Sequence, residues 1–419
     1  MQKPDIEIAA LLGKNAQQLI TCRVNLCVHK QITDVRWRPN SDEVLYTATD
    51  PSEGMAQSIF RWNVKTGSVL PVTHSIGLLN GGERYGGRDA GCGLSNVAIV
   101  CVAANADRPP RLEKIDLQSG NQQVLFDPNA SLAKDFAAIA PARLLRWKDA
   151  KGRSFTGEFF AARKVGGVPG PLFVSYYVCP GFLRSAFGDD WPLATFAEHG
   201  ISALCINHAP IRFNAVERYS LALSGVESAV ALLASSGEID RTKVGMGGLS
   251  FGTEITMWTA FNSNLLAATS ITAAVPSLSM YLHTSLKGDF TSALHREWQL
   301  GSFEETPEQW RKIGLQFNLS KIKPPVLMQM PEQEYEWILD SAIPLMRAHR
   351  ADMYVFPNAP HFKFQPKQLL AANERNVDWF RYWLQDYEDT DPAKRGQYVI
   401  WQAMKAHNSD QGRHGDAKD

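Results

Sequence analysis

The sequence has little of what nucleic-acid binding, membrane insertion or metal coordination requires. Its 43 Lys and Arg residues equal its 43 Asp and Glu residues, and without a long basic run the electrostatic footprint of a nucleic-acid-binding protein is missing. No apolar stretch reaches about 18 residues, the length of a membrane span. The ten histidines show neither HExxH nor H-x-H spacing, so we expect no metal ion and no other cofactor.

Cysteine is also scarce and shows no motif. The six cysteines contain no C-x-x-C pair: Cys22, Cys27, Cys92, Cys101, Cys179 and Cys205. This scatter predicts buried thiols in a reducing compartment rather than a disulfide framework or a zinc site. The first residues of the chain also lack the long apolar core of a secretion signal. Both observations predict a cytoplasmic protein; neither indicates an oligomeric state.

What the chain does have is room for two or three domains, with 419 residues of which 44% are hydrophobic. Between residues 32 and 129, short β-like runs alternate with turn clusters. One order occurs twice: strands, a turn ending in Thr-Gly or Ser-Gly (residues 65–67 and 118–120), and a closing strand. Such repetition is typical of β-propeller blades. Two unrelated hairpins are the alternative.

From residue 142 onward the pattern changes to alternating β and α segments, which is typical of a mostly parallel sheet with helices on both faces. We expect strands at 171–178, 201–206, 243–247, 266–275, 325–330 and 353–356, and helices at 190–199, 215–235, 254–261, 340–349 and 367–385. Residues 276–320 have the composition of an irregular, aromatic-rich insertion. The predicted domains are therefore a partial propeller-like region (1–141), an α/β domain (142–389) and a partly disordered tail (390–419).

The most informative motif is Gly-Leu-Ser-Phe-Gly at residues 248–252, which matches G-x-S-x-G. In this motif a sharp turn between a strand and a helix exposes the serine hydroxyl, and a Cβ at either glycine would collide with the backbone. By chance the pattern occurs in about one chain of this size in ten. Here an apolar strand precedes it and a helix-like segment follows it, so Ser250 is predicted to be a nucleophile rather than part of a plain glycine-rich turn.

A serine nucleophile needs a base and an acid, which in the α/β-hydrolase order follow late strands. His361 is the one histidine placed directly after such a strand, in the loop behind residues 353–356. The acid is expected behind the strand at 325–330, where the chain carries Glu332, Glu334 and Glu336 but no aspartate. A glutamate can orient the imidazole and stabilise its charged form. Glu334 is the preferred candidate and the other two remain open.

A propeller-like start followed by a hydrolase domain resembles the prolyl oligopeptidase family of serine peptidases. In that family the acid sits in a strand-H-G-x-x-D-x-x-V segment, and aligning residues 326–331 with its start puts Glu334 on the aspartate. The resemblance also implies an oxyanion hole made by the Phe251 backbone N–H and the Tyr177 hydroxyl. The sequence of residues 248–254, together with a glutamate in place of the catalytic aspartate, is most similar to the lasso peptide isopeptidases within this family.

That resemblance implies a serine peptidase whose substrate is a peptide, with hydrolysis of the isopeptide bond that closes a lasso ring through an acyl-enzyme on Ser250. Two features depart from the family. Only about two blades precede residue 142, where the family has about seven, so the chain is expected to be a fragment, a late-start product or a degraded member. The arginine that proline-specific members carry after the acid is also missing. An esterase or general oligopeptidase of the same fold, and a non-catalytic binding module, are the alternatives.

Overall fold

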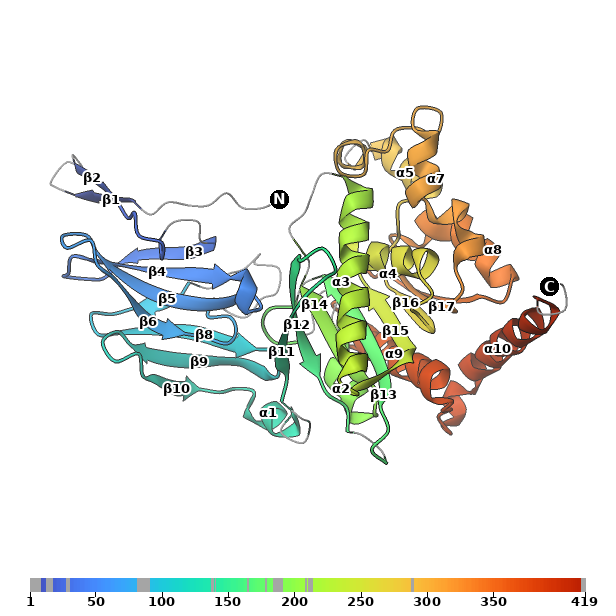
Figure 1. The fold of residues 1–419 in the computed structure, drawn as a ribbon, viewed down its shortest axis with the longest axis horizontal. Coiled ribbons are helices and arrows are strands. Elements are labelled where there is room, and N and C mark those ends of the chain that lie inside the picture. Colours follow the sequence, from blue (N-terminus) through green and yellow to red (C-terminus); the bar gives the residue numbers. More distant parts are fainter. Residues whose placement is uncertain are drawn as a thin grey trace. The chain divides into compact units, whose positions relative to one another are not determined.

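The computed structural model describes the chain from residue 9 to residue 415, apart from short internal segments. The residues outside the description are 1–8, 13–17, 28–30, 81–90, 137–138, 140, 164–165, 178, 184–190, 208, 210–213, 288–289 and 416–419. Two compact units are formed (Figure 1). The N-terminal unit contains Met1–Arg146, Thr156–Glu158 and Val178–Arg184, and the C-terminal unit contains Trp147–Phe155, Phe159–Tyr177 and Ser185–Asp419.

Two antiparallel sheets of four strands make up most of the N-terminal unit, after a small hairpin of β1 (Ala9–Leu12) and β2 (Gln18–Thr21). The first sheet has the order β3 (Gln31–Trp37), β4 (Glu43–Asp50), β5 (Ala56–Asn63), β6 (Val69–His74). The second contains β7 (Gly93–Leu94), β8 (Ala98–Asn105), β9 (Arg108–Asp116) and β10 (Gln122–Phe126), and helix α1 (Ala130–Phe136) follows it.

The same turn chemistry closes the outer hairpin of both sheets. Asn63 Oδ1 accepts hydrogen bonds from the backbone amides two and three residues ahead, both at 3.0 Å. Asp116 Oδ1 does the same at 3.0 and 2.7 Å. Gly67 and Gly120 then adopt φ values of 74° and 73°, a conformation that glycine adopts without steric cost. Each of the two sheets thus has four antiparallel strands, the arrangement that the sequence predicted for a propeller-like blade.

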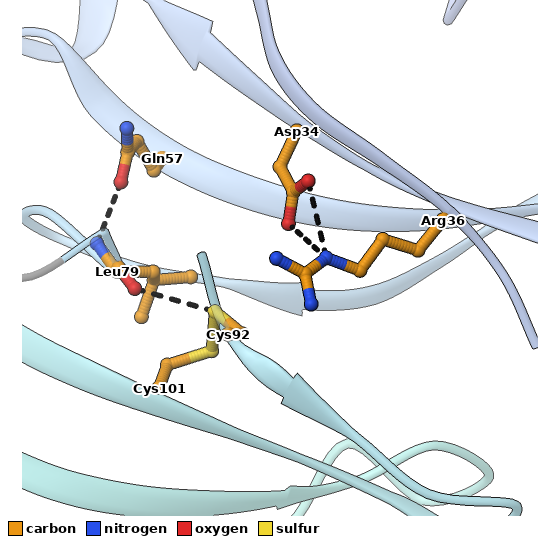
Figure 2. Close-up of a disulfide and its surroundings, with 6 residues drawn as sticks. All are labelled: Asp34, Arg36, Gln57, Leu79, Cys92 and Cys101. Carbon is orange, nitrogen blue, oxygen red and sulfur yellow. Dashed lines mark hydrogen bonds and ion pairs between the residues drawn. A yellow bond between two sulfur atoms is a disulfide. The ribbon is translucent and has the colours of Figure 1, made fainter. Parts of the chain in front are cut away.

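Apolar side chains from both sheets form one core between the blades. Its members are Leu45, Ile59, Val72, Leu79, Cys92, Ile99, Cys101, Ala103, Ile115 and Leu117. Gln57 is buried beside this core with 1% of its surface exposed, and its side-chain oxygen accepts from the Leu79 backbone N–H at 2.6 Å (Figure 2). Because a buried amide without a partner is costly, this contact fixes the chain that connects the two blades.

The prediction of free thiols is wrong, because all six cysteines are disulfide-bonded. Cys22 bonds to Cys27 and Cys92 bonds to Cys101 (Figure 2), and Cys179 and Cys205 are also oxidised. The second bond follows from strand register: Gly93 pairs with Val100, so the residues just outside that pair face each other with Cα atoms 4.4 Å apart. Disulfides are typical of oxidising compartments, so the cysteine argument for a cytoplasmic protein no longer holds.

Thiol titration is expected to find no reactive thiol in the unreduced, denatured chain and six after reduction. The Cys92–Cys101 bond closes a loop of nine residues' separation, so the double replacement by alanine should lower the free energy of unfolding by about 2 to 3 kcal/mol. Urea unfolding measures this loss. Reactive thiols in the unreduced chain would contradict the pairing.

Glu158 is expected to give the chain a pH-dependent stability. Burial raises the pKa of this carboxyl to about 7; the Asp107 charge raises this pKa further, and Arg146 opposes the shift. In the unfolded chain the pKa is about 4.3. Between these values the folded state binds more protons, so this carboxyl's contribution to stability is present below about pH 4 and is lost as pH rises through 7.

The Glu158→Gln variant is therefore expected to be more stable than the parent at pH 8, by on the order of 2 to 3 kcal/mol, because the amide carries no charge to desolvate. Thermal melts at pH 5 and pH 8 test this. The advantage should shrink toward the lower pH. An advantage that grows on acidification would show that another group dominates.

An eight-stranded sheet organises the C-terminal unit, in the order β11-β12-β14-β13-β15-β16-β17-β18. The strands are β11 (Arg143–Lys148), β12 (Ser154–Phe160), β13 (Gly170–Tyr177), β14 (Ser202–Asn207), β15 (Ile239–Gly248), β16 (Ala268–Ile271), β17 (Val326–Pro331) and β18 (Ala351–Phe356). Strands β13 to β18 run parallel. This is the sheet of an α/β-hydrolase domain, as predicted.

Helices cover both faces of this sheet (Figure 1). They are α2 (Leu193–Glu198), α3 (Ala215–Ser235), α4 (Phe251–Asn262), α8 (Leu339–Arg347) and α9 (Pro366–Gln385). Helix α10 (Arg395–Gly415) follows α9 and contacts the last strand, β18, where Trp401 Nε1 donates to Asp352 at 2.9 Å. The glycines of β15 allow α9 to approach closely: a Cβ on Gly245 would lie 2.5 Å from the Phe380 ring. On Gly247 it would lie 2.5 Å from Trp191. Both rings therefore pack on the strand that leads to Ser250.

Two segments are more ordered than expected. The insertion after β16 is largely helical, with α5 (Leu278–Lys287), α6 (Thr291–Ala293), a π-helical turn (Leu294–Trp298) and α7 (Pro307–Ile313). The tail expected to be partly disordered forms α10, because Tyr398, Trp401 and Met404 lie three residues apart and are buried. Among the described residues, no helix combines the length and apolar character that crossing a bilayer requires.

Candidate active site

Ser250 occupies a strained turn between β15 and α4. Its φ of 54° and ψ of −125° lie in a region that residues other than glycine rarely adopt. The flanking glycines make the turn possible. A Cβ on Gly248 would lie 2.0 Å from the Gly252 carbonyl carbon, and a Cβ on Gly252 would lie 2.9 Å from the Tyr176 carbonyl oxygen. The collision argument made from the motif therefore holds in the structure.

A cavity of about 770 Å³ opens over this turn, within the C-terminal unit. Five of the residues singled out from the sequence as site candidates line it, namely Tyr177, Ser250, Phe251, Glu334 and His361, whereas Glu332 and Glu336 are not among its lining residues. The helical insertion supplies much of the remaining wall, including Met280, His283, Leu286 and Trp298. The structure thus brings together residues from the ends of β13, β15, β17 and β18.

Glu334 and His361 form a hydrogen-bonded pair in this cavity. Nδ1 of His361 bonds to Oε1 of Glu334, and Oε2 of Glu334 accepts from the Ala274 backbone N–H at 3.0 Å. Glu334 is 5% exposed, whereas the imidazole is 34% exposed. A buried carboxylate that holds Nδ1 fixes the imidazole orientation and leaves Nε2 to act toward the cavity.

The other two glutamates lie elsewhere. Glu332 is exposed and accepts from the backbone N–H of Asn358, and Glu336 is exposed and accepts from the Tyr335 hydroxyl at 3.2 Å. Neither of these contacts reaches the imidazole. Of the three carboxylates left open by the sequence, the geometry therefore favours Glu334.

Sequence reasoning missed Lys363, which lies two residues beyond the histidine. This lysine is 5% exposed and its ammonium lies 5.2 Å from the centre of the Phe356 ring. Burial lowers the pKa of Lys363 to about 8, and the negative charge of Glu334 opposes that shift. Lys363 therefore adds a buried cation whose charge interacts with that of Glu334.

The two tyrosines at the end of β13 have different surroundings. The Tyr176 hydroxyl is buried and accepts from the Ala209 backbone N–H at 3.0 Å, and burial raises the pKa of Tyr176 to about 12. Tyr177 lines the cavity, with its ring centre 5.7 Å from that of Phe251. The Phe251 N–H belongs to the first turn of α4, where amides have no partner within the helix. Tyr177 and this amide are the two donors that the resemblance predicted for an oxyanion hole.

Beside the serine the structure shows a buried polar cluster that no sequence pattern indicated. The Tyr219 hydroxyl donates to Oε2 of Glu254, and Trp298 Nε1 donates to the same oxygen at 2.9 Å. Burial raises the pKa of Glu254 above its usual value, although these two donors and the nearby Arg218 act against the shift. Over the described part of the chain, no group of three or more His, Cys, Asp or Glu side chains could hold a metal ion.

An α/β-hydrolase domain that carries a serine on a strand–helix turn and a histidine–glutamate pair, in a chain that begins with propeller-like blades, is similar in architecture to the prolyl oligopeptidase family. The chain is similar to lasso peptide isopeptidase AtxE2 of Asticcacaulis excentricus, with 26% identity over 393 residues. The match covers 88% of this chain and 54% of that protein, so the chain spans about half the length of its curated relative.

Solved structures give the same result for the fold. AtxE2 without ligand matches with a TM-score of 0.81 and 22% identity, over 95% of this chain and 61% of that one. An AtxE2 variant with Astexin3-dC4 bound matches with a TM-score of 0.80, and the match covers 93% of this chain and 60% of that one. The acylaminoacyl peptidase of Pyrococcus horikoshii matches with a TM-score of 0.65 and 17% identity, and the match covers 87% of this chain and 58% of that one.

No protein-family model matches the chain. The resemblance inferred from the motifs, to prolyl oligopeptidase-family serine peptidases and most of all to lasso peptide isopeptidases, is nevertheless confirmed by these relatives.

Proposed function

We propose that the chain is a serine hydrolase that cleaves an amide bond of a peptide through an acyl-enzyme. The observation that supports this most is the presence of a strained Ser250 and a His361–Glu334 pair around one cavity. Strain at a non-glycine turn persists only where the surrounding structure enforces it, and such outliers cluster at active sites. The peptidase relatives support the same reaction class.

In the proposed mechanism His361 removes the hydroxyl proton as Ser250 Oγ attacks the carbonyl carbon. The carbonyl oxygen becomes an oxyanion that accepts hydrogen bonds from the Phe251 N–H and the Tyr177 hydroxyl. Collapse of this intermediate breaks the C–N bond, and the imidazolium gives its proton to the departing amine. Water, deprotonated by His361, then hydrolyses the ester and restores the serine. Glu334 stabilises the imidazolium throughout.

The proposed substrate is a peptide whose ring is closed by an amide between the N-terminal amine and an Asp or Glu side chain. Support comes from the relative AtxE2, which is named a lasso peptide isopeptidase and whose variant structure holds Astexin3-dC4. The cavity of about 770 Å³ over Ser250 has the size of a typical ligand pocket and can take up the residues on either side of the bond.

Three substrates assayed side by side test this proposal: a peptide closed by such an isopeptide bond, the same sequence in linear form, and a short ester. The proposal expects ring opening, seen as a gain of one water by mass spectrometry, to be fastest. A fast ester with no ring opening would favour a general esterase. Fast cleavage of the linear peptide would favour an oligopeptidase. No turnover of any of them would favour a binding module.

A further inference from the structure

Arg218, in the first turns of α3, is a buried cation in the wall of the candidate active site. Its side chain lines the same cavity as Ser250, yet only 6% of the residue is exposed. Nε and Nη2 have no hydrogen-bond partner among the described residues. Burying a guanidinium without hydrogen bonds or an ion pair is costly, so a charge in this position needs an explanation that the catalytic steps above do not supply.

Aromatic rings surround the guanidinium and hold it in place. Its central carbon lies 5.2 Å from the ring centre of Phe251, 5.4 Å from that of Trp298 and 6.0 Å from that of Tyr219. Contacts of this kind stabilise a cation, but they leave its positive charge uncompensated. Since Phe251 directly follows Ser250, the charge lies beside the position where a substrate is attacked.

The carboxylates nearby are engaged with other groups. Oε2 of Glu254 already accepts from Tyr219 and Trp298. Glu297, at the cavity wall, accepts from Arg296 at 2.9 Å. Among the described residues, no carboxylate accepts a hydrogen bond from Nε or Nη2 of Arg218, so these donors remain for an incoming anion.

We propose that Arg218 is a specificity-determining residue that binds a carboxylate of the substrate close to the scissile amide. An arginine suits this role because its planar donors match a carboxylate better than any other side chain does. The class of substrate is thus a peptide with an acidic group, either a side-chain carboxylate or the chain's own C-terminus, within reach of the bond. This inference rests on the proposed hydrolase function.

A set of matched peptides tests the proposal. One carries Asp or Glu beside the scissile amide, a second carries the isosteric Asn or Gln, and a third has its C-terminus amidated. The parent chain is expected to prefer the acidic member, and Arg218→Gln should lower the ratio of kcat/KM values, acidic over amide, by about tenfold to a hundredfold. Loss of preference in the side-chain pair or in the C-terminal pair identifies which carboxylate is bound.

Two further variants separate recognition from packing. Arg218→Lys keeps the charge without the planar donors and should retain part of the preference. Arg311→Gln is the matched control, because Arg311 also lies over a ring, 5.8 Å from the Phe303 centre, but is exposed and pairs with Glu308. This control should leave the ratio unchanged.

An equal loss on acidic and neutral peptides in Arg218→Gln would overturn the proposal and make the arginine a positioning residue for Phe251. If that variant does not fold, competition on the parent chain decides: N-acetylaspartate amide should inhibit at least about tenfold better than N-acetylasparagine amide, and equal inhibition would overturn the proposal. Failure of the parent to hydrolyse any peptide or to react with a fluorophosphonate would instead count against the hydrolase function.

Discussion

Replacing Ser250 by alanine is expected to lower the rate of hydrolysis by on the order of a millionfold while leaving the melting temperature within a few degrees of the parent. Loss of the nucleophile removes covalent catalysis altogether. The fold should tolerate the change because the missing hydroxyl leaves no cavity of consequence. The strained φ of 54° at this turn does not depend on the hydroxyl. Hydrolysis rates and thermal melts of the purified variant measure both effects.

Ser235→Ala is the matched control, since that hydroxyl is exposed at the end of α3 and only donates to the Leu232 carbonyl. It should keep the parental rate. If the activity of Ser250→Ala stayed within about tenfold of the parent, the assignment of Ser250 as the nucleophile would be contradicted, because removal of a nucleophile usually lowers the rate far more.

Glu334→Gln is expected to lower the rate by about ten-thousandfold. The amide keeps the volume of the side chain but cannot stabilise the imidazolium, and its NH₂ group can force the wrong tautomer on His361. The backbone N–H of Ala274 would still find an oxygen to donate to, so the local structure has no reason to change. Steady-state kinetics measure the loss, and an unchanged circular dichroism spectrum checks the fold.

Glu332 and Glu336 supply matched controls on the same loop. Both are exposed and make contacts away from the imidazole, so their glutamine variants should change the rate only slightly. If Glu332→Gln instead showed the large loss of rate, the alignment of the strand at 326–331 with the family's acid segment would be off by two residues.

Much of the catalytic arrangement could be predicted from the sequence because it depends on local geometry. The glycines around Ser250 indicate a tight turn, and the predicted helix at 215–235 coincides with α3 (Ala215–Ser235). His361 and Glu334 could be found because the ends of parallel strands meet at one edge of a sheet, here at β17 and β18. The roles given to these side chains stay proposals until the variants are measured.

What could not be predicted depends on contacts between distant segments. The Cys92–Cys101 pair needs the register of β7 and β8, which spacing alone does not contain. The helices of the insertion depend on buried tryptophans such as Trp310, whose Nε1 donates to the Gly301 carbonyl at 3.0 Å. Arg218 belongs to no sequence motif, and only the fold places it against Phe251 and Trp298.

Active-site labelling tests the central claim most directly, since only an activated serine reacts quickly with a fluorophosphonate. Mass spectrometry of the labelled parent chain should find one adduct, and peptide mapping should place it on Ser250. Ser250→Ala should remain unlabelled, and Glu334→Gln should react far more slowly than Glu332→Gln. A parent chain that takes up no label, or a Ser250→Ala variant that takes up as much as the parent, would contradict the account.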